Sequence, residues 1–152
     1  MYGLHYVALR YANGYGPRQN PHGEAGVVSI FGTRCLRGEE CSIFGDGGQA
    51  RDFVYVADVV RANLAALSTD FCGYINIGTG LETDVNRVYA LIAAASGFNR
   101  PARHLEKRLG EARRSAVDAS LAGRILGWRP EMAFTDGIRQ TEEWFRTSLP
   151  AR

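Results

Sequence analysis

Hydrophobic and polar positions follow two periods along the chain. Short apolar runs bounded by Gly, Asn and Pro predict strands, and apolar residues three and four apart predict helices. The predicted strands are 6–10, 42–44, 51–56 and 74–77. The predicted helices are 26–36, one beginning at Asp58, one from Thr83 to Gly97, one from Asp118 to Gly127 and one capped by Thr135. Strands that alternate with helices are typical of an α/β fold.

The first predicted strand begins a few residues after Met1, so the parallel sheet has only two or three members. A parallel sheet is normally covered on both faces, and so small a sheet is hard to bury alone. An unpaired strand edge favours pairing with another chain. The pattern therefore resembles the second part of a larger protein, and we expect a homo-oligomer, at least a dimer.

Composition narrows the class of protein. The 152 residues are 45% hydrophobic and 22% charged, which is ordinary for a globular chain, and the net charge of +2 argues against nucleic-acid binding. No apolar run approaches the about 18 residues of a membrane span, so no membrane association is expected. No signal peptide is visible, and the three cysteines read as free thiols, so the predicted location is cytoplasmic. Cysteines and histidines lack ligand spacing, so no metal is expected.

The stretch IFGDGGQARDFVYVADV, residues 43–59, places a strand directly after a glycine-rich turn. Side chains alternate along a strand, so Arg51 shares a face with Phe53, whereas Asp52 and Val54 point the other way. A nucleotide would suit this face, since Phe44 or Phe53 can pack on a base or sugar and Arg51 can bind phosphate. The alternative is a surface arginine whose stem covers an aromatic ring.

Two further stretches are ambiguous. The stretch KRLGEARRSAVD, residues 107–118, groups arginines around Glu111, and it can be either a solvated loop or an anion site.

The stretch YINIGTGLETDVNRV resembles a dinucleotide-binding turn at Gly78-Thr79-Gly80. Thr83 stands where the third glycine would be, and no acidic residue follows at the ribose-binding distance. We interpret that stretch as a tight turn and a helix cap.

Three stretches together carry a family resemblance: ALRYANGYGPRQNPHGEAGVVSIF, IFGDGGQARDFVYVADVVRANLAAL and RLGEARRSAVDASLAGRILGWRP. The chain resembles the C-terminal half of the nucleotide-sugar epimerases and dehydratases of the extended short-chain dehydrogenase/reductase family, with UDP-glucose 4-epimerases as the most similar group. The resemblance implies a Rossmann-type α/β fold. Residues 1–16 and 50–80 would contribute the last parallel strands and a helix, and the rest of 1–152 would form the small α/β nucleotide-sugar-binding domain.

The resemblance also implies a binding site for a UDP-sugar. Arg51 and Arg108 would clamp the diphosphate, with Asn13 reaching the same group from the end of the first strand. Glu111 would accept hydrogen bonds from the ribose hydroxyls, and Phe53 stands where the family often has Tyr. The remaining expected contacts are Gly26 and Val27 along the nucleotide, Ser42 and Phe44 flanking the uracil, and Tyr15 and Pro17 near the nicotinamide end of NAD.

The family's catalytic Tyr-x-x-x-Lys and its glycine fingerprint for NAD do not occur in this sequence. We therefore expect no catalytic residue here, NAD binding mainly by an N-terminal half, and an inactive isolated chain. The implied activity is NAD-dependent epimerisation of UDP-glucose and UDP-galactose. The alternatives are another nucleotide-sugar epimerase, a 4,6-dehydratase, or a non-catalytic module that binds sugar nucleotide or pairs with a separate NAD-binding chain.

Overall fold

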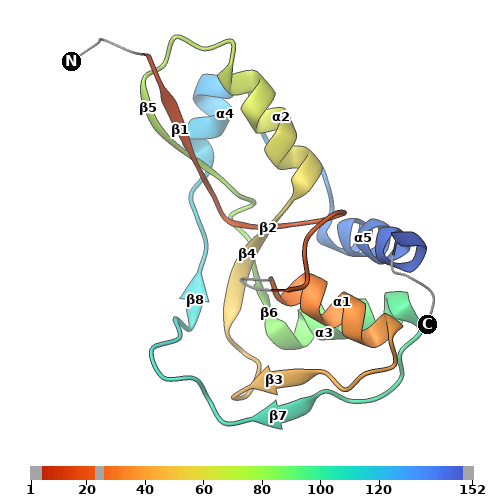
Figure 1. Cartoon of the computed structure of the whole chain (residues 1–152). Helices are drawn as coiled ribbons and strands as arrows, with labels where there is room; N and C mark the ends of the chain where they lie inside the picture. Colours follow the sequence, from red (N-terminus) through yellow and green to blue (C-terminus); the bar gives the residue numbers. More distant parts are fainter. Residues whose placement is uncertain (1–4, 23–25, 149–152) are drawn as a thin grey trace.

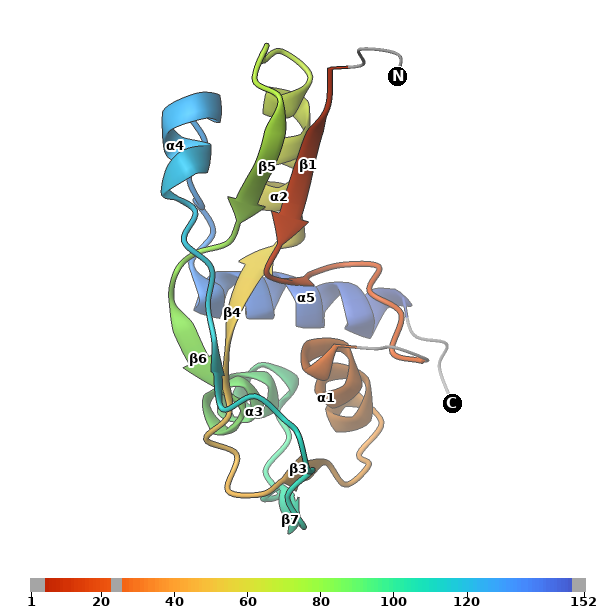
Figure 2. The same ribbon diagram turned by 90° about the vertical axis from the view of Figure 1, so that its left-hand side faces the viewer.

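The strand β4 (Ala50–Tyr55) runs through the middle of the computed structural model, which describes residues 5–22 and 26–148 (Figure 1). Figure 2 shows one group of elements above β4, namely β1 (Val7–Tyr11), β5 (Gly73–Ile77), α2 (Val56–Ala66) and α4 (Ser120–Leu126). A second group lies below it, namely α1 (Val27–Leu36), α3 (Val85–Ser96), β3 (Ser42–Phe44) and β7 (Arg103–Leu105). The remaining elements are β2 (Asn13–Tyr15), β6 (Glu82–Asp84), β8 (Arg114–Ser115) and α5 (Phe134–Ser148).

Strand pairing confirms the α/β class. β1 pairs in parallel with β5 over their whole lengths, and these two strands form a sheet of their own. β4 lies outside that sheet and pairs in parallel with β2 and β8 and antiparallel with β6. β3 pairs in parallel with β7. Within the described residues, no helix is long and apolar enough to cross a membrane.

The two faces of β4 are buried in different hydrophobic cores. Phe53 and Tyr55 pack into the lower core, between α1, α3 and α5, and Val54 packs into the upper core with Ile75 and Ile77 of β5. The predicted alternation along this strand is therefore confirmed. Because β4 serves both cores, it fixes the two groups of elements relative to each other.

Four predicted helix starts are wrong, and those of α2 and α3 are the first two. Asp84, not Thr83, is the N-cap of α3, and its side chain accepts a hydrogen bond from the backbone N–H of Arg87 at 2.8 Å. Thr83 lies in β6, one residue too early to reach those amides. α2 begins at Val56, before Asp58.

Asp58 is instead a buried link between α2 and the segment before α5. Its carboxylate accepts hydrogen bonds from the backbone N–H groups of Glu131 (3.2 Å) and Met132 (3.1 Å). Its backbone carbonyl accepts one from the Trp128 indole at 2.8 Å. These long-range partners, rather than a helix cap, explain a carboxylate at this position.

The predicted ends of α3 and α4 are confirmed, whereas the predicted starts of α4 and α5 are wrong. Gly97 and Gly127 end α3 and α4 in the left-handed conformation, with φ of +71° and +60°, as the glycines predict. The N-cap of α4 is Ala119 rather than Asp118, although the Asp118 carboxylate still accepts a hydrogen bond from the Ser120 N–H at 2.8 Å. α5 begins at Phe134, so Thr135 lies inside the helix and is not its cap.

α5 carries a buried carboxyl group into the lower core. Glu142 is 1% exposed, and Oε2 accepts a hydrogen bond from the Ser96 hydroxyl at 2.7 Å, whereas Oε1 has no hydrogen-bond partner in the part of the chain that the structure describes. The same hydroxyl lies 2.8 Å from the Ile92 carbonyl oxygen. One hydroxyl proton cannot serve both acceptors at once, so a proton on the carboxyl group lets both contacts be hydrogen bonds. Burial raises the pKa of Glu142 to about 7.

We predict that Glu142 makes the protein less stable as the pH rises. Its pKa is raised from 4.5 to about 7 in the folded state, so its contribution is complete below pH 4.5 and is lost as the pH rises to about 7. Between pH 4.5 and pH 8, the free energy of unfolding of Glu142→Gln should rise by about 2 to 3 kcal/mol relative to that of the wild type. Urea denaturation at both pH values measures this difference. Glu143→Gln, at an exposed neighbouring position, is the control, and parallel pH profiles for wild type and Glu142→Gln would contradict the prediction.

Candidate functional site

A cavity of about 400 Å³ lies where β2 and β4 meet the start of α1. The parallel register places Asn13 opposite Phe53, and the Asn13 side-chain amide donates to the Asp52 carbonyl at 3.1 Å. Polar and aromatic groups from distant parts of the chain thus share one wall. Of the predicted site residues, this cavity is lined by Asn13, Tyr15, Gly26, Val27, Arg51, Phe53 and Glu111.

A second cavity, of about 440 Å³, adjoins the first. Four residues line both cavities, namely Val27, Gln49, Val85 and Glu111. The predicted residues that the second cavity adds are Ser42, Phe44 and Arg108. All nine residues predicted to contact the substrate therefore line one continuous cleft, whose size is in the range of small-ligand sites.

Arginines dominate the charge of this cleft. Among the described residues, its charged lining side chains are Arg34, Arg51, Arg108 and Glu111, three positive and one negative. The Arg51 guanidinium lies 3.6 Å from the Glu111 carboxylate and donates to the Ala50 carbonyl at 2.8 Å. An ion pair of that length at a partly exposed position is weak, so an anionic ligand can compete for Arg51.

Arg108 is positioned by an aromatic ring. Its guanidinium carbon lies 3.8 Å from the centre of the Phe44 ring, which is cation–π geometry. Phe44 ends β3, and Arg108 follows β7, the strand that pairs with β3. The strand pairing therefore brings the two side chains together, although they are far apart in the sequence.

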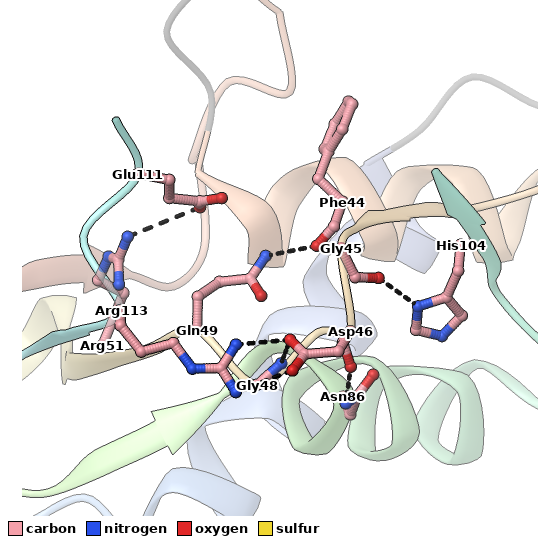
Figure 3. Close-up of polar contacts among 10 residues, drawn as sticks. All are labelled: Phe44, Gly45, Asp46, Gly48, Gln49, Arg51, Asn86, His104, Glu111 and Arg113. Atoms are coloured by element: carbon pink, nitrogen blue, oxygen red, sulfur yellow. Dashed lines mark hydrogen bonds and ion pairs between the residues drawn. The ribbon is translucent and has the colours of Figure 1, made fainter. Parts of the chain in front are cut away.

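Two residues that the sequence analysis did not single out, Gln49 and Val85, line both cavities. The Gln49 side-chain amide donates to the Phe44 carbonyl at 3.0 Å, across the glycine-rich turn (Figure 3). Val85 is the first residue of α3, and its N–H donates to the Gln49 carbonyl at 3.2 Å. A polar residue between a glycine-rich turn and a strand was the one available signal for Gln49, and nothing in the sequence pointed to Val85.

Tyr15 and Pro17 line a third cavity, of about 480 Å³ and mostly apolar, at the carboxyl end of β1 and the start of α2. It shares Gly14, Tyr15 and Gln19 with the first cavity. Tyr15 is buried, its ring packs edge-on against Phe53, and its hydroxyl donates to the Phe134 carbonyl at 3.4 Å. The hydroxyl of Tyr15 is therefore directed toward α5, and only its ring is available to this cavity.

The turn Gly78-Thr79-Gly80 donates its hydrogen bonds to a side-chain carboxylate of the protein, that of Asp52, and not to a ligand. The Asp52 carboxylate accepts hydrogen bonds from the backbone N–H groups of Thr79 and Gly80 (2.9 Å each) and from the Thr79 hydroxyl (2.6 Å). These are the donors that a phosphate would need. The interpretation of this stretch as a structural turn agrees with the geometry. No group of three potential ligands among residues 5–22 and 26–148 could hold a metal ion.

Together, these observations define an α/β domain with an arginine-rich cleft suited to a small anionic ligand that also carries an apolar ring. The sequence pattern of the NAD dependent epimerase/dehydratase family matches residues 1–78. The chain belongs to this family.

Solved structures and curated proteins extend the match. UDP-glucose 4-epimerase from Thermotoga maritima, solved with UDP-glucose, is 49% identical with a TM-score of 0.92, covering 98% of this chain and 48% of that one. The Thermus thermophilus enzyme, solved with NAD, is 41% identical with a TM-score of 0.86, covering 97% and 49%. UDP-glucose 4-epimerase of Mycolicibacterium smegmatis is 44% identical over 96% of this chain and 47% of its own length. The chain thus spans about half the length of these relatives.

Proposed function

We propose that this chain provides the UDP-sugar site of an NAD-dependent epimerase that interconverts UDP-glucose and UDP-galactose. The observation that carries the proposal is the convergence of Arg51, Arg108 and Glu111 on one cleft beside the Phe44 ring. A nucleoside diphosphate offers a charged group for the arginines, ribose hydroxyls for the carboxylate and a flat base for the apolar wall. Relatives solved with UDP-glucose and with NAD support the choice of ligand and cofactor.

In this proposal, the residues divide the nucleotide between them. Arg51 and Arg108 bind the diphosphate, and Glu111 leaves its ion pair with Arg51 to accept from the ribose. Asn13, Gly26 and Val27 line the path of the nucleotide, Phe53 forms its wall, and Ser42 and Phe44 flank the uracil. An anchored diphosphate leaves the sugar free to turn while the nucleotide stays in place, which epimerisation requires.

NAD, when bound, supplies a hydride acceptor that also returns the hydride. The third cavity, with Pro17, Val56 and Val59 in its lining, offers an apolar surface for a ring and adjoins the sugar-nucleotide cleft. The described residues fit one end of the dinucleotide but not its diphosphate, since the Gly78-Thr79-Gly80 donors are taken by Asp52. We therefore assign to this chain the nicotinamide side alone, with the rest of NAD bound by the remaining half. The cysteines are free thiols, as is usual for proteins of the reducing cytoplasm, so we still expect a cytoplasmic location.

A second candidate is a 4,6-dehydratase, because the family to which the chain belongs includes dehydratases as well as epimerases. The cleft would bind its sugar nucleotide in the same way. A non-catalytic sugar-nucleotide-binding module is the third reading, and it uses the same contacts without turnover. The experiments below separate binding from catalysis.

We predict that the chain binds UDP and that Arg51→Ala and Arg108→Ala each weaken binding about 10- to 100-fold, the range for a lost hydrogen bond to a charged group. Calorimetric titration with UDP measures the affinity. Arg139→Ala is the control, because Arg139 is exposed on α5 and lines none of the three cavities. Wild-type affinity in both cleft variants would show that the diphosphate is bound elsewhere.

We predict no epimerase turnover by the isolated chain, even with NAD and UDP-galactose in excess. The only lysine is Lys107, and the residue four positions before it is Arg103 rather than a tyrosine. The general base of the family is therefore not supplied. Nuclear magnetic resonance of the UDP-galactose anomeric proton follows the reaction, and conversion to UDP-glucose above a protein-free blank would refute this expectation.

The isolated chain should also self-associate, with a second copy covering its apolar face. Val56, Val60 and Leu64 of α2 and its C-cap Leu67 lie on one side of the helix and are 39%, 51%, 61% and 83% exposed. β1, next to this helix, is paired only with β5 in the structure described here, so one edge of a two-stranded parallel sheet is open. An apolar stripe beside an open edge is a typical association surface.

Light scattering of the purified chain should therefore give a dimer or a larger species. Val60→Lys combined with Leu64→Lys should shift it toward the monomer, because two buried charges would oppose the contact. Leu109→Lys is the matched control, since Leu109 is fully exposed on a different part of the molecule. A monomeric wild type would contradict the association.

A further inference from the structure

The loop 106–113 carries two residues of the cleft, Arg108 and Glu111, yet most of its side chains are exposed. Its two ends are held beside the glycine-rich turn 45–49. The Gly45 N–H donates to the Leu105 carbonyl at one end, and the Ala50 N–H donates to the Arg113 carbonyl at the other, both at 2.9 Å. The loop and the turn therefore lie side by side, and their contacts decide where Arg108 and Glu111 sit.

One side-chain contact joins the turn to the loop directly. Arg113 donates through Nη1 to Asp46 Oδ1 at 2.6 Å and through Nη2 to Asp46 Oδ2 at 2.9 Å (Figure 3). Two parallel charge-assisted hydrogen bonds define an orientation as well as a distance. These bonds hold the pKa of Asp46 well below its usual range. Asp46 is therefore a carboxylate at neutral pH and can accept both hydrogen bonds.

Asp46 is itself held in place from two directions. Its Oδ1 accepts the Gly48 N–H at 3.0 Å, which closes the turn. The side-chain amide of Asn86, on α3, donates to the Asp46 carbonyl at 2.8 Å, and the Asn86 N–H donates to the Gly47 carbonyl at 3.2 Å. A continuous path therefore runs from the rigid helix α3 through Asp46 and Arg113 to the loop.

The second ion pair across this region cannot play the same part. Arg51 and Glu111 lie 3.6 Å apart and both line the cleft, so a bound diphosphate draws Arg51 away from Glu111. Asp46 and Arg113 line neither of the two cleft cavities. The contact between them can therefore persist while the nucleotide is bound.

We propose that Asp46 and Arg113 are positioning residues, whose bidentate contact holds the loop 106–113 so that Arg108 and Glu111 meet a bound nucleotide. The proposal rests on the function proposed above. Exposed ion pairs contribute little to the stability of a whole domain. The effect of this pair therefore lies in nucleotide affinity, and the fold should tolerate its loss.

The test is UDP titration of Asp46→Asn. Asparagine keeps an oxygen for the Gly48 N–H but loses the charge and the two-oxygen acceptor for Arg113. We expect UDP affinity to fall about 5- to 20-fold, less than after the loss of a direct phosphate contact because Asp46 acts only through the loop, with the melting temperature unchanged. Arg113→Lys should have a similar effect, because an ammonium group cannot form the fork. Asp136→Asn is the matched control, since it breaks a comparable exposed pair with Arg139 (2.7 Å) on α5.

A double-mutant cycle distinguishes positioning from a general structural effect. If Asp46 acts through the loop, Asp46→Asn should lower UDP affinity by a clearly smaller factor in an Arg108→Ala background than in the wild type. Equal costs in both backgrounds, wild-type affinity of Asp46→Asn, or a fall in melting temperature that accounts for the lost binding would each overturn the proposal. Failure of the wild type to bind UDP would instead remove the proposed function, and this inference with it.

Discussion

The Asp52 carboxylate, in the centre of β4, accepts hydrogen bonds from the loop after β5 and, at 3.4 Å, from the Val117 N–H. The group is 1% exposed, so these donors are what makes a buried charge tolerable. They tie two distant segments of the chain to one strand. The side chains on either side of Asp52 are Arg51 and Phe53, both in the cleft wall. The geometry of the cleft therefore depends on a carboxylate that does not touch the ligand space.

Strand pairing also arranges the two loops that form the cleft. β3 and β4 flank the turn 45–49, and their partners β7 and β8 flank the loop 106–113. The same register brings Arg108 over Phe44 and Glu111 near Arg51. Two polar loops that are far apart in the sequence thus become the two sides of one cleft. This pairing brings Arg51 and Arg108, which are far apart in the sequence, into the lining of one cleft.

Much of this arrangement could be predicted from the sequence, because local physics decides it. Alternation placed Arg51 and Phe53 on one face of a strand, and glycines marked the ends of α3 and α4. The helix starts were less predictable, because a carboxylate near a helix start can serve as a cap or as a link. Asp84 is a cap and Asp58 is a link, and only the partners of Asp58 in the segment 131–132 reveal the difference. Gln49, Val85 and the contact between Asp46 and Arg113 depend on tertiary pairing, which no local pattern contains.

In the proposed function, Arg51 and Arg108 bind one diphosphate from two sides of the cleft. A crystal structure of the chain with UDP tests this claim most directly. Phosphate oxygens should lie within about 3 Å of both guanidinium groups, and Glu111 should be turned from Arg51 toward the ribose. A diphosphate bound by only one of the arginines, or UDP bound outside the cleft with the pair between Arg51 and Glu111 intact, would contradict it.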